Sequence, residues 1–211
     1  MPSTRCCWSR ARAGFVAAAL LVLAPAGCSS AANTAAPPGP LDRFDPIATF
    51  AAMAAYAGPH ARVVQLQATH VRVDGTIDLT AASRPKLDAE FVAAAIAGDP
   101  ETRPPGEFAV GHSIVVRLTV EAPHTSPQGQ HRGMERTPTR RTTGDERTLE
   151  PPECTFAALW QAAIGQGAPT DTTATIAYTA DGYTFTADGG AFERRFKADC
   201  SPVAAKRARK K

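Results

Sequence analysis

Cysteine and histidine are the residues of this 211-residue chain best suited to chemistry, and the chain has five of each. Neither type forms a recognisable site, because there is no Cys-x-x-Cys pair, no His-Glu-x-x-His helix and no histidine pair at ligand spacing on a predicted helix. The sequence also lacks a Gly-x-Ser-x-Gly turn, a phosphate-binding glycine loop and calcium-loop spacing. We therefore assign no catalytic residue, no metal ligand and no cofactor from sequence motifs.

The histidines are scattered along the chain, and most are expected to be solvated. They are His60, His70, His112, His124 and His131. His124 and His131 fall in a polar segment, where solvated side chains are expected and a weak metal site is the alternative. His70 falls on the apolar face of a predicted strand, which is typical of a packed residue with hydrogen-bonded ring nitrogens.

The first thirty residues have the pattern of an export signal. Arg5, Arg10 and Arg12 precede an uncharged run over 14–26, and the small residues of 27–30 follow. A run of about 12 apolar residues is too short to span a bilayer as a helix. A basic region, a short apolar region and small residues at its end instead predict a leader that is removed, so residues 1–27 are expected to be a signal peptide.

The triplet Ala26-Gly27-Cys28 after this run resembles the lipobox of bacterial lipoproteins. In that family the cysteine thiol is acylated and the chain is cut just before it, so the resemblance implies that Cys28 carries a lipid. The resemblance covers the leader alone. It departs from the family's pattern at Pro25, where leucine or another aliphatic residue usually stands.

Two other outcomes for the leader remain open. Ala24-Pro25-Ala26 fits the small-x-small site of the ordinary secretory peptidase, which would cut before Gly27, and an uncut anchor is the third outcome. We expect acylation, because a free thiol at a mature N-terminus is unusual in an oxidising compartment.

Cys154 and Cys200 are the cysteines that the leader does not account for. An exported protein with two otherwise unassigned cysteines most simply pairs them, and two buried thiols are the alternative. The predicted disulfide closes a loop of 46 residues. On the chain-entropy argument such a closure stabilises the fold by about 4 kcal/mol.

The net positive charge belongs to the ends of the chain. Of 23 lysines and arginines, three lie in the leader and five in the last six residues, which leaves 15 against 20 acidic residues over 28–205. This mildly acidic body argues against a nucleic-acid-binding surface. The basic end at 206–211 is expected to be a solvated tail, and contact with anionic lipid headgroups is the alternative.

The N-terminal half predicts one helix and several strands. A helix is expected over 45–56, with Asp45 as its cap and Gly58 after its end. Residues rich in β-branched side chains flank Asp74-Gly75, which predicts a hairpin. Its core face would carry Leu66, Ala68, His70, Ile77 and Leu79.

The rest of this half is less regular. Residues 85–96 fit a helix or a strand, and we favour a strand. Residues 113–122 are a clear strand, rich in valine and isoleucine. Over 123–152 the apolar side chains nearly vanish, which predicts a long mobile loop whose deletion over 124–148 leaves stability almost unchanged.

The C-terminal unit has the most regular pattern. Apolar residues at helical spacing from Phe156 to Ile164 follow Thr155, which can cap the helix, and Gly165 can end it. Turns at Asp181-Gly182 and Gly189-Gly190 predict two hairpins. Their apolar face is Ile176, Tyr178, Tyr183, Phe185, Phe192 and Phe196.

Three aromatic residues of this unit, Trp160, Tyr178 and Tyr183, are expected in the core, and the alternative is that they line a ligand groove between helix and sheet. Arg194 is expected to snorkel at the sheet edge.

The two halves share an order of elements, which predicts an α+β fold of two similar units. Each unit has one helix packed on an antiparallel meander, and the two can share one sheet. The divisions are a signal peptide (1–27), a flexible tether (28–41), an N-terminal unit (42–122), a mobile linker (123–152), a disulfide-bracketed unit (153–201) and a basic tail (202–211).

A helix followed by an antiparallel meander is similar, by arrangement alone, to small exported modules of the PepSY type and to proteinaceous β-lactamase inhibitors. The resemblance implies a sheet that serves as a binding or inhibitory surface, and it assigns no functional residue. We therefore expect a non-enzymatic binding or structural module of the bacterial envelope. Its partners would be the membrane, through lipid on Cys28, and a protein or envelope polymer. A soluble secreted or periplasmic form, an envelope hydrolase and a protein inhibitor are the alternatives.

Overall fold

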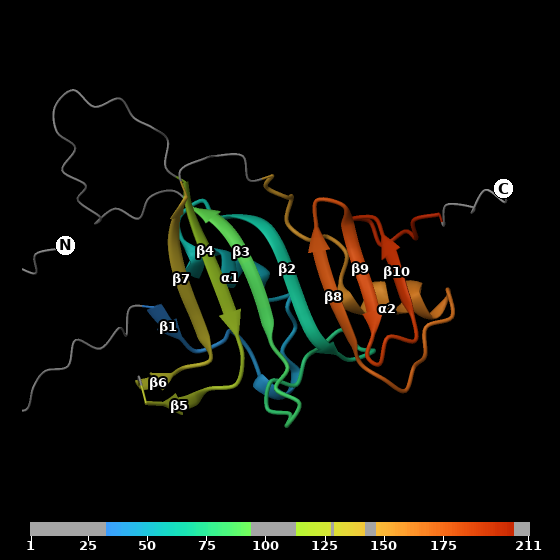
Figure 1. Cartoon of the computed structure of the whole chain (residues 1–211), viewed down its shortest axis with the longest axis horizontal. Coiled ribbons are helices and arrows are strands. Elements are labelled where there is room, and N and C mark those ends of the chain that lie inside the picture. The colour runs from blue at the N-terminus through green and yellow to red at the C-terminus, as the bar shows by residue number, and fades with distance from the viewer. Residues whose placement is uncertain (1–32, 94–112, 128, 142–146, 205–211) are drawn as a thin grey trace, which may run out of the picture.

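The computed structural model describes residues 33–93, 113–127, 129–141 and 147–204. Cys28, His112 and the basic end at 205–211 lie outside these ranges. Within them the chain folds into two helices, an eight-stranded antiparallel sheet and a small two-stranded sheet (Figure 1). The predicted α+β class with antiparallel strands is confirmed.

The large sheet is built from both halves of the chain. Its strands are β1 (Thr34–Ala35), β2 (Arg62–Val71), β3 (Leu87–Ala93), β4 (Ser113–Val120), β7 (Met134–Arg141), β8 (Ala174–Thr179), β9 (Gly182–Ala187) and β10 (Glu193–Phe196). Their order is β1-β7-β4-β3-β2-β8-β9-β10, and β5 (His124–Ser126) pairs with β6 (Gly129–His131) in the small sheet. The strands that follow the two helices, β2 and β8, therefore join the halves in one sheet.

One face of the sheet is covered by α1 (Phe50–Ala57) and α2 (Phe156–Ile164), which both lie behind the sheet in Figure 1. Met53 of α1 and Trp160 of α2 are fully buried in one continuous apolar core with the inward side chains of the strands. Among the residues described, neither helix has the length and apolar character needed to cross a membrane.

The C-terminal unit forms as its sequence pattern predicts. Thr155 Oγ1 accepts a hydrogen bond from Ala158 N at 3.1 Å and caps α2. Strands β8, β9 and β10 form the two hairpins, and the six predicted core residues are all buried. The first hairpin differs in register, because Tyr178 lies opposite Tyr183 where Phe185 was predicted. A shift of two residues keeps every side chain on its face.

The predicted hairpin at Asp74-Gly75 is wrong. The turn forms, with Asp74 Oδ1 accepting from Thr76 N at 3.0 Å, but the residues after it do not pair along β2. Ile77 instead exchanges two backbone hydrogen bonds with Phe44, at 2.8 and 2.9 Å. Gly75 has φ +82°, and a Cβ there would overlap the backbone nitrogen of Ala157. This turn therefore belongs to the layer under the sheet, packed against the start of α2.

His70 does not lie on the regular core face of β2. It has φ +55°, within a register shift of the β2–β8 pairing between Ala68 and Val71. His70 is half-buried there, and Val71 is fully buried. Strand alternation predicted the opposite placement, because it assumes an uninterrupted strand. The expectation of hydrogen-bonded ring nitrogens is wrong for Nδ1, which is buried and has no hydrogen-bond partner among the described residues.

The predicted loop over 123–152 is wrong for much of its length, because β5, β6 and β7 lie in it. Strand β7 pairs with β4 from Met134 to Arg141 without a break. Among residues 134–139 only Met134 is buried, so β7 has no apolar alternation to reveal it. Its backbone hydrogen bonds to β4 hold it in the sheet.

The tether over 28–41 and the first helix are shorter than predicted. Strand β1 pairs with β7, Pro37 is buried, and a 3₁₀ turn covers Leu41–Arg43. Helix α1 spans Phe50–Ala57, and Asp45 Oδ1 caps the turn before it, accepting from two backbone N–H groups.

Candidate functional site

The face of the sheet opposite the helices is lined with polar side chains. Residues directly opposite on antiparallel strands point to the same face. A row of such residues crosses seven strands and consists of Glu135, Thr119, Asp88, Gln67, Ala177, Thr184 and Arg195. The row is partly bonded within itself, since Thr119 Oγ1 donates to Asp88 Oδ1 at 2.9 Å.

A second row lies beside the first on the same face. It runs from Thr137 through Arg117 and Glu90 to Gln65, with each residue opposite the next. Gln65 Nε2 donates to Glu90 Oε2 at 3.3 Å, and Glu90 is only 7% exposed. The face therefore carries hydroxyl, amide and charged groups that can hydrogen-bond a polar partner, although Glu90 and the apolar Val115 are buried within it.

A cluster of histidine and glutamate side chains lies at the end of β4, in the part of Figure 1 where the β5–β6 hairpin lies beside β7. His124 and His131 are directly opposite on this hairpin, so their rings stack with centroids 4.7 Å apart. Glu121 follows the last residue of β4, and its backbone N–H donates to Gly133 O at 2.8 Å. The hairpin thus closes back on the strand and brings the three side chains together.

The three side chains of this cluster, Glu121, His124 and His131, converge through atoms that can bind a cation. Glu121 Oε1 lies 3.6 Å from His124 Nδ1 and 3.8 Å from His131 Nδ1. The three candidate ligand atoms all lie within 4.8 Å of one another. Imidazole nitrogen and carboxylate oxygen are ligands of divalent transition metals.

Glu135 of β7 fixes the ring of His131. The carboxylate oxygen Oε2 lies 2.9 Å from His131 Nε2, on the side of the ring away from the cluster, and the His131 side chain is only 10% exposed. Gly133 N donates to His131 Nδ1 at 3.3 Å, which requires a lone pair on Nδ1. Gly133 has φ +106°, and a Cβ there would come within 3.0 Å of Glu121 O. The close turn at Gly133 therefore depends on glycine.

A cavity of about 460 Å³ opens beside the cluster. It is lined by Leu79, Thr80, Ala81, Arg84, Pro85, Glu121, Ala122, His124 and Thr125. Two cluster residues, Glu121 and His124, thus face a space large enough for a small molecule, with the cation Arg84 in its wall.

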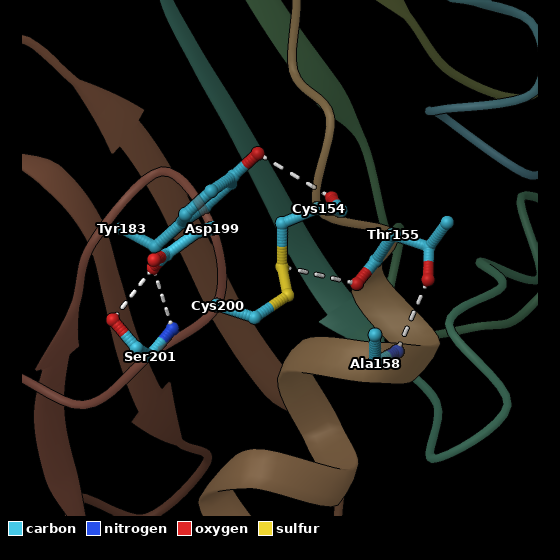
Figure 2. Close-up of a disulfide and its surroundings, with 7 residues drawn as sticks. All are labelled: Cys154, Thr155, Ala158, Tyr183, Asp199, Cys200 and Ser201. Atoms are coloured by element: carbon cyan, nitrogen blue, oxygen red, sulfur yellow. Dashed lines mark hydrogen bonds between the residues drawn. A yellow bond between two sulfur atoms is a disulfide. The ribbon is translucent and has the colours of Figure 1, made fainter.

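The predicted cysteine pair is present as a disulfide. Cys154 and Cys200 are bonded, with Cα atoms 5.6 Å apart, between the start of α2 and the turn after β10 (Figure 2). Ser201 N and Oγ both donate to Asp199 Oδ1, at 2.9 and 2.6 Å, and shape the turn that contains Cys200. The disulfide has a structural position, far along the sheet from the histidine cluster.

The three aromatic residues considered for a ligand groove are core residues. Trp160 and Tyr183 are fully buried and Tyr178 is nearly so. The hydroxyl of Tyr183 donates to Cys154 O at 3.4 Å and that of Tyr178 to Glu150 O at 3.2 Å, which ties the segment before α2 to the sheet. Burial raises the pKa of both tyrosines, and the neighbouring Glu153 raises them further.

Arg194 lies opposite Phe185 in the β9–β10 pairing, as predicted, and it is exposed. Its guanidinium lies over the Phe192 ring, 5.3 Å from the centroid. The side chain thus reaches solvent while stacking on an aromatic ring at the edge of the core.

The sequence missed the histidine cluster because it placed His124 and His131 in a mobile loop. The available signal was weak: Pro127 and Gly129 are turn-forming residues midway between the two histidines. Glu121 could not be placed without knowing that the hairpin folds back on β4. His60 and His70 lie outside this cluster.

No protein-family model, curated protein or solved structure matches this chain. Its function must therefore be argued from its own residues.

Proposed function

We propose that this protein is an exported, non-enzymatic binding or structural module of the bacterial envelope, anchored by a lipid on Cys28. The observation that carries the proposal is the distribution of polar side chains. Both helices cover one face of the sheet, and the other face is left as rows of polar residues from β7 to β10. A surface of this kind, held on a rigid sheet, suits a protein or envelope polymer as partner.

The start of the described chain supports a close attachment. Asn33 Oδ1 accepts a hydrogen bond from Arg136 Nε at 3.3 Å, and β1 follows directly. Cys28 is five residues before Asn33, so the chain between them spans at most about 18 Å. A lipid on Cys28 would hold the β1–β7 edge of the sheet beside the membrane and leave β8–β10 further from it.

The arrangement of strands supports a duplicated origin for the two units. In each half one helix precedes three strands that are neighbours in the sheet. The first strands, β2 and β8, pair antiparallel at the centre, with Gln67 opposite Ala177, and the second and third strands follow outward on each side. Two copies related by a local twofold axis would give this order. The polar face would then be a surface made of two related halves.

The lipid anchor is tested by intact-mass measurement of the protein from membrane fractions. We expect a mature chain that begins at a diacylated or triacylated Cys28. A soluble product that begins at Gly27 would contradict the anchor and leave an ordinary secreted protein.

The binding face is tested by photo-crosslinking in native envelopes. Gln67 and Gln161 form a matched pair, because both are exposed and they lie on the polar face and on α2 respectively. A crosslinking residue at Gln67 should yield a discrete adduct, and one at Gln161 should not. Equal yields at both positions, or an adduct at Gln161 alone, would contradict a partner on the polar face.

A further inference from the structure

We propose that Glu121, His124 and His131 bind one divalent transition-metal ion of the zinc class at the end of β4. This site is separate from the disulfide, and it adjoins the polar face at Glu135, whose carboxylate contacts His131. The donor set selects the metal. Two imidazoles with one carboxylate suit Zn²⁺ and its neighbours in the first transition row, whereas Ca²⁺ and Mg²⁺ require oxygen ligands.

The separations between the ligand atoms are close to those of a metal site. Two ligands on a tetrahedral Zn²⁺ with bonds near 2.0 to 2.1 Å lie about 3.4 Å apart. The distances from Glu121 Oε1 to His124 Nδ1 and His131 Nδ1 are 3.6 and 3.8 Å. All three ligand atoms lie within 4.8 Å of one another. The two imidazoles are stacked, at an interplanar angle of 21°, so binding requires them to rotate until both Nδ1 atoms point at one ion.

The environment of His131 supplies the outer support of a metal ligand. A ligating histidine usually donates its other ring N–H to a carboxylate, which fixes its tautomer and orientation. Glu135 Oε2 lies 2.9 Å from His131 Nε2, and the carboxylate comes from a different strand, β7. With the Nε2 proton donated to Glu135, Nδ1 keeps a lone pair, which accepts from Gly133 N at 3.3 Å, and this nitrogen lies 3.8 Å from Glu121 Oε1. The Glu135 carboxylate thus orients the ring through Nε2 and leaves Nδ1 as the ligand atom.

The bonds that a metal would replace are weak. Gly133 N donates to His131 Nδ1 over 3.3 Å, and His124 Nδ1 lies 3.3 Å from Ala122 O. Hydrogen bonds of this length contribute little. Binding moves the proton of His124 to Nε2, and the half-exposed side chain leaves that nitrogen access to water.

Charge and access both favour a cation here. Glu121 and Glu135 bring two carboxylates to the two imidazole rings. Glu121 and His124 also line the 460 Å³ cavity, so the coordination positions that the protein does not fill can be reached by water or a small ligand. Three protein ligands with an open position are typical of zinc sites that exchange a ligand.

Titration of the full mature chain with Zn²⁺ tests the site. The protein is prepared without a polyhistidine tag, stripped with chelator and titrated in competition with a chromophoric chelator. We expect one equivalent to bind. His124→Asn and His131→Asn should each weaken the affinity by more than about tenfold, and Glu135→Gln by about 10- to 100-fold, the usual effect of losing an outer partner. Co²⁺ in place of Zn²⁺ should give visible absorption of four- or five-coordinate type.

His60→Asn is the matched control, because His60 is exposed, lies outside the cluster and has a backbone conformation, φ +55°, that asparagine tolerates. It should bind Zn²⁺ like the parent chain. Metal-free melting curves of each variant show whether the fold is intact. Absence of stoichiometric binding to the parent chain would overturn the proposal and leave the cluster as an ion-pair network, and equal affinities of His131→Asn and His60→Asn would do the same. Neither result bears on Cys28 or on the crosslinking at Gln67.

Discussion

At the C-terminal end of the sheet, Trp160 of α2 meets Phe185 of β9 edge to face, with ring centroids 4.7 Å apart, and a disulfide closes the unit. At the opposite end, β7 is held by its backbone pairing to β4 and carries two exposed threonines, Thr137 and Thr139, beside the half-buried Glu135 and Arg136. The first end is stabilised by the burial of its aromatic side chains. The second is stabilised by its backbone, which leaves histidines and glutamates available for chemistry.

The largest change in stability is expected from the deletion of residues 124–148, which the sequence alone predicts to be harmless. The structure predicts the reverse, because the deletion removes β7, uncovers the edge of β4 and exposes the core around Met134. Loss of Met134 burial alone costs about 1.5 to 3 kcal/mol. We expect a partly unfolded or aggregating protein, measured by circular dichroism and size-exclusion chromatography.

The matched variant replaces only residues 122–132 with Asn-Gly. Glu121 and Gly133 are already hydrogen-bonded across the strands, so a two-residue turn can join β4 to β7 directly. Its melting temperature should stay within a few degrees of the parent, and zinc should no longer raise it. If both deletions melt near the parent temperature, β7 contributes little and the comparison between the two ends fails. If both melt far below it, the prediction that residues 122–132 are dispensable fails.

The next largest loss of stability is expected from removal of the disulfide at the C-terminal end of the sheet. Cys154→Ser with Cys200→Ser should lower the free energy of unfolding by about 2 to 4 kcal/mol, because the bridge closes a long loop in the unfolded chain. Urea titrations measure the loss. Reductant should destabilise the parent chain to the same level and leave the double variant unchanged. A response of the variant to reductant would mean that another bond is being reduced.

These two ends also explain what could be predicted from the sequence. In β8 and β9 one face is buried and the other is not, so alternation of Ile176, Tyr178 and Phe185 with threonines marks the strands and their core face. In strand β7 only Met134 is buried among residues 134–139, so its composition resembles that of a loop. A buried face requires apolar residues and so can be seen in the sequence, whereas backbone pairing near a sheet edge hardly restricts residue type.

The remaining errors have local causes. The segment after Asp74-Gly75 has strand composition, but its partner is Phe44, far away in sequence, and not the strand before the turn. The register irregularity at His70 breaks an alternation that the sequence cannot show to be broken. The histidine cluster needs the fold-back of a hairpin onto Glu121, which is a tertiary contact with no signature in either segment alone.

A smaller effect is expected at the start of α2. Thr155→Ala removes the oxygen that accepts from Ala158 N and should cost about 1 kcal/mol. Thr155→Ser keeps that oxygen and should be nearly neutral. Chemical denaturation of both variants distinguishes capping from side-chain packing, because equal losses would show that the methyl group matters more than the hydrogen bond.

The smallest effect at neutral pH is expected from Tyr183→Phe, which loses one long hydrogen bond to Cys154 O and should cost under about 1 kcal/mol. At alkaline pH we expect the substitution to become less harmful, because it removes a group whose ionisation destabilises the fold. Burial raises the pKa of Tyr183 in the folded protein, so near pH 10 and above the unfolded chain loses this proton first. The stability of the parent chain is therefore fully present below pH 10 and declines as the pH rises further. Tyr183→Phe lacks this ionisation and should lose less stability between pH 9 and pH 11, measured by urea denaturation at each pH. Parallel pH profiles would contradict the inference that alkali acts on the C-terminal end through its buried tyrosine.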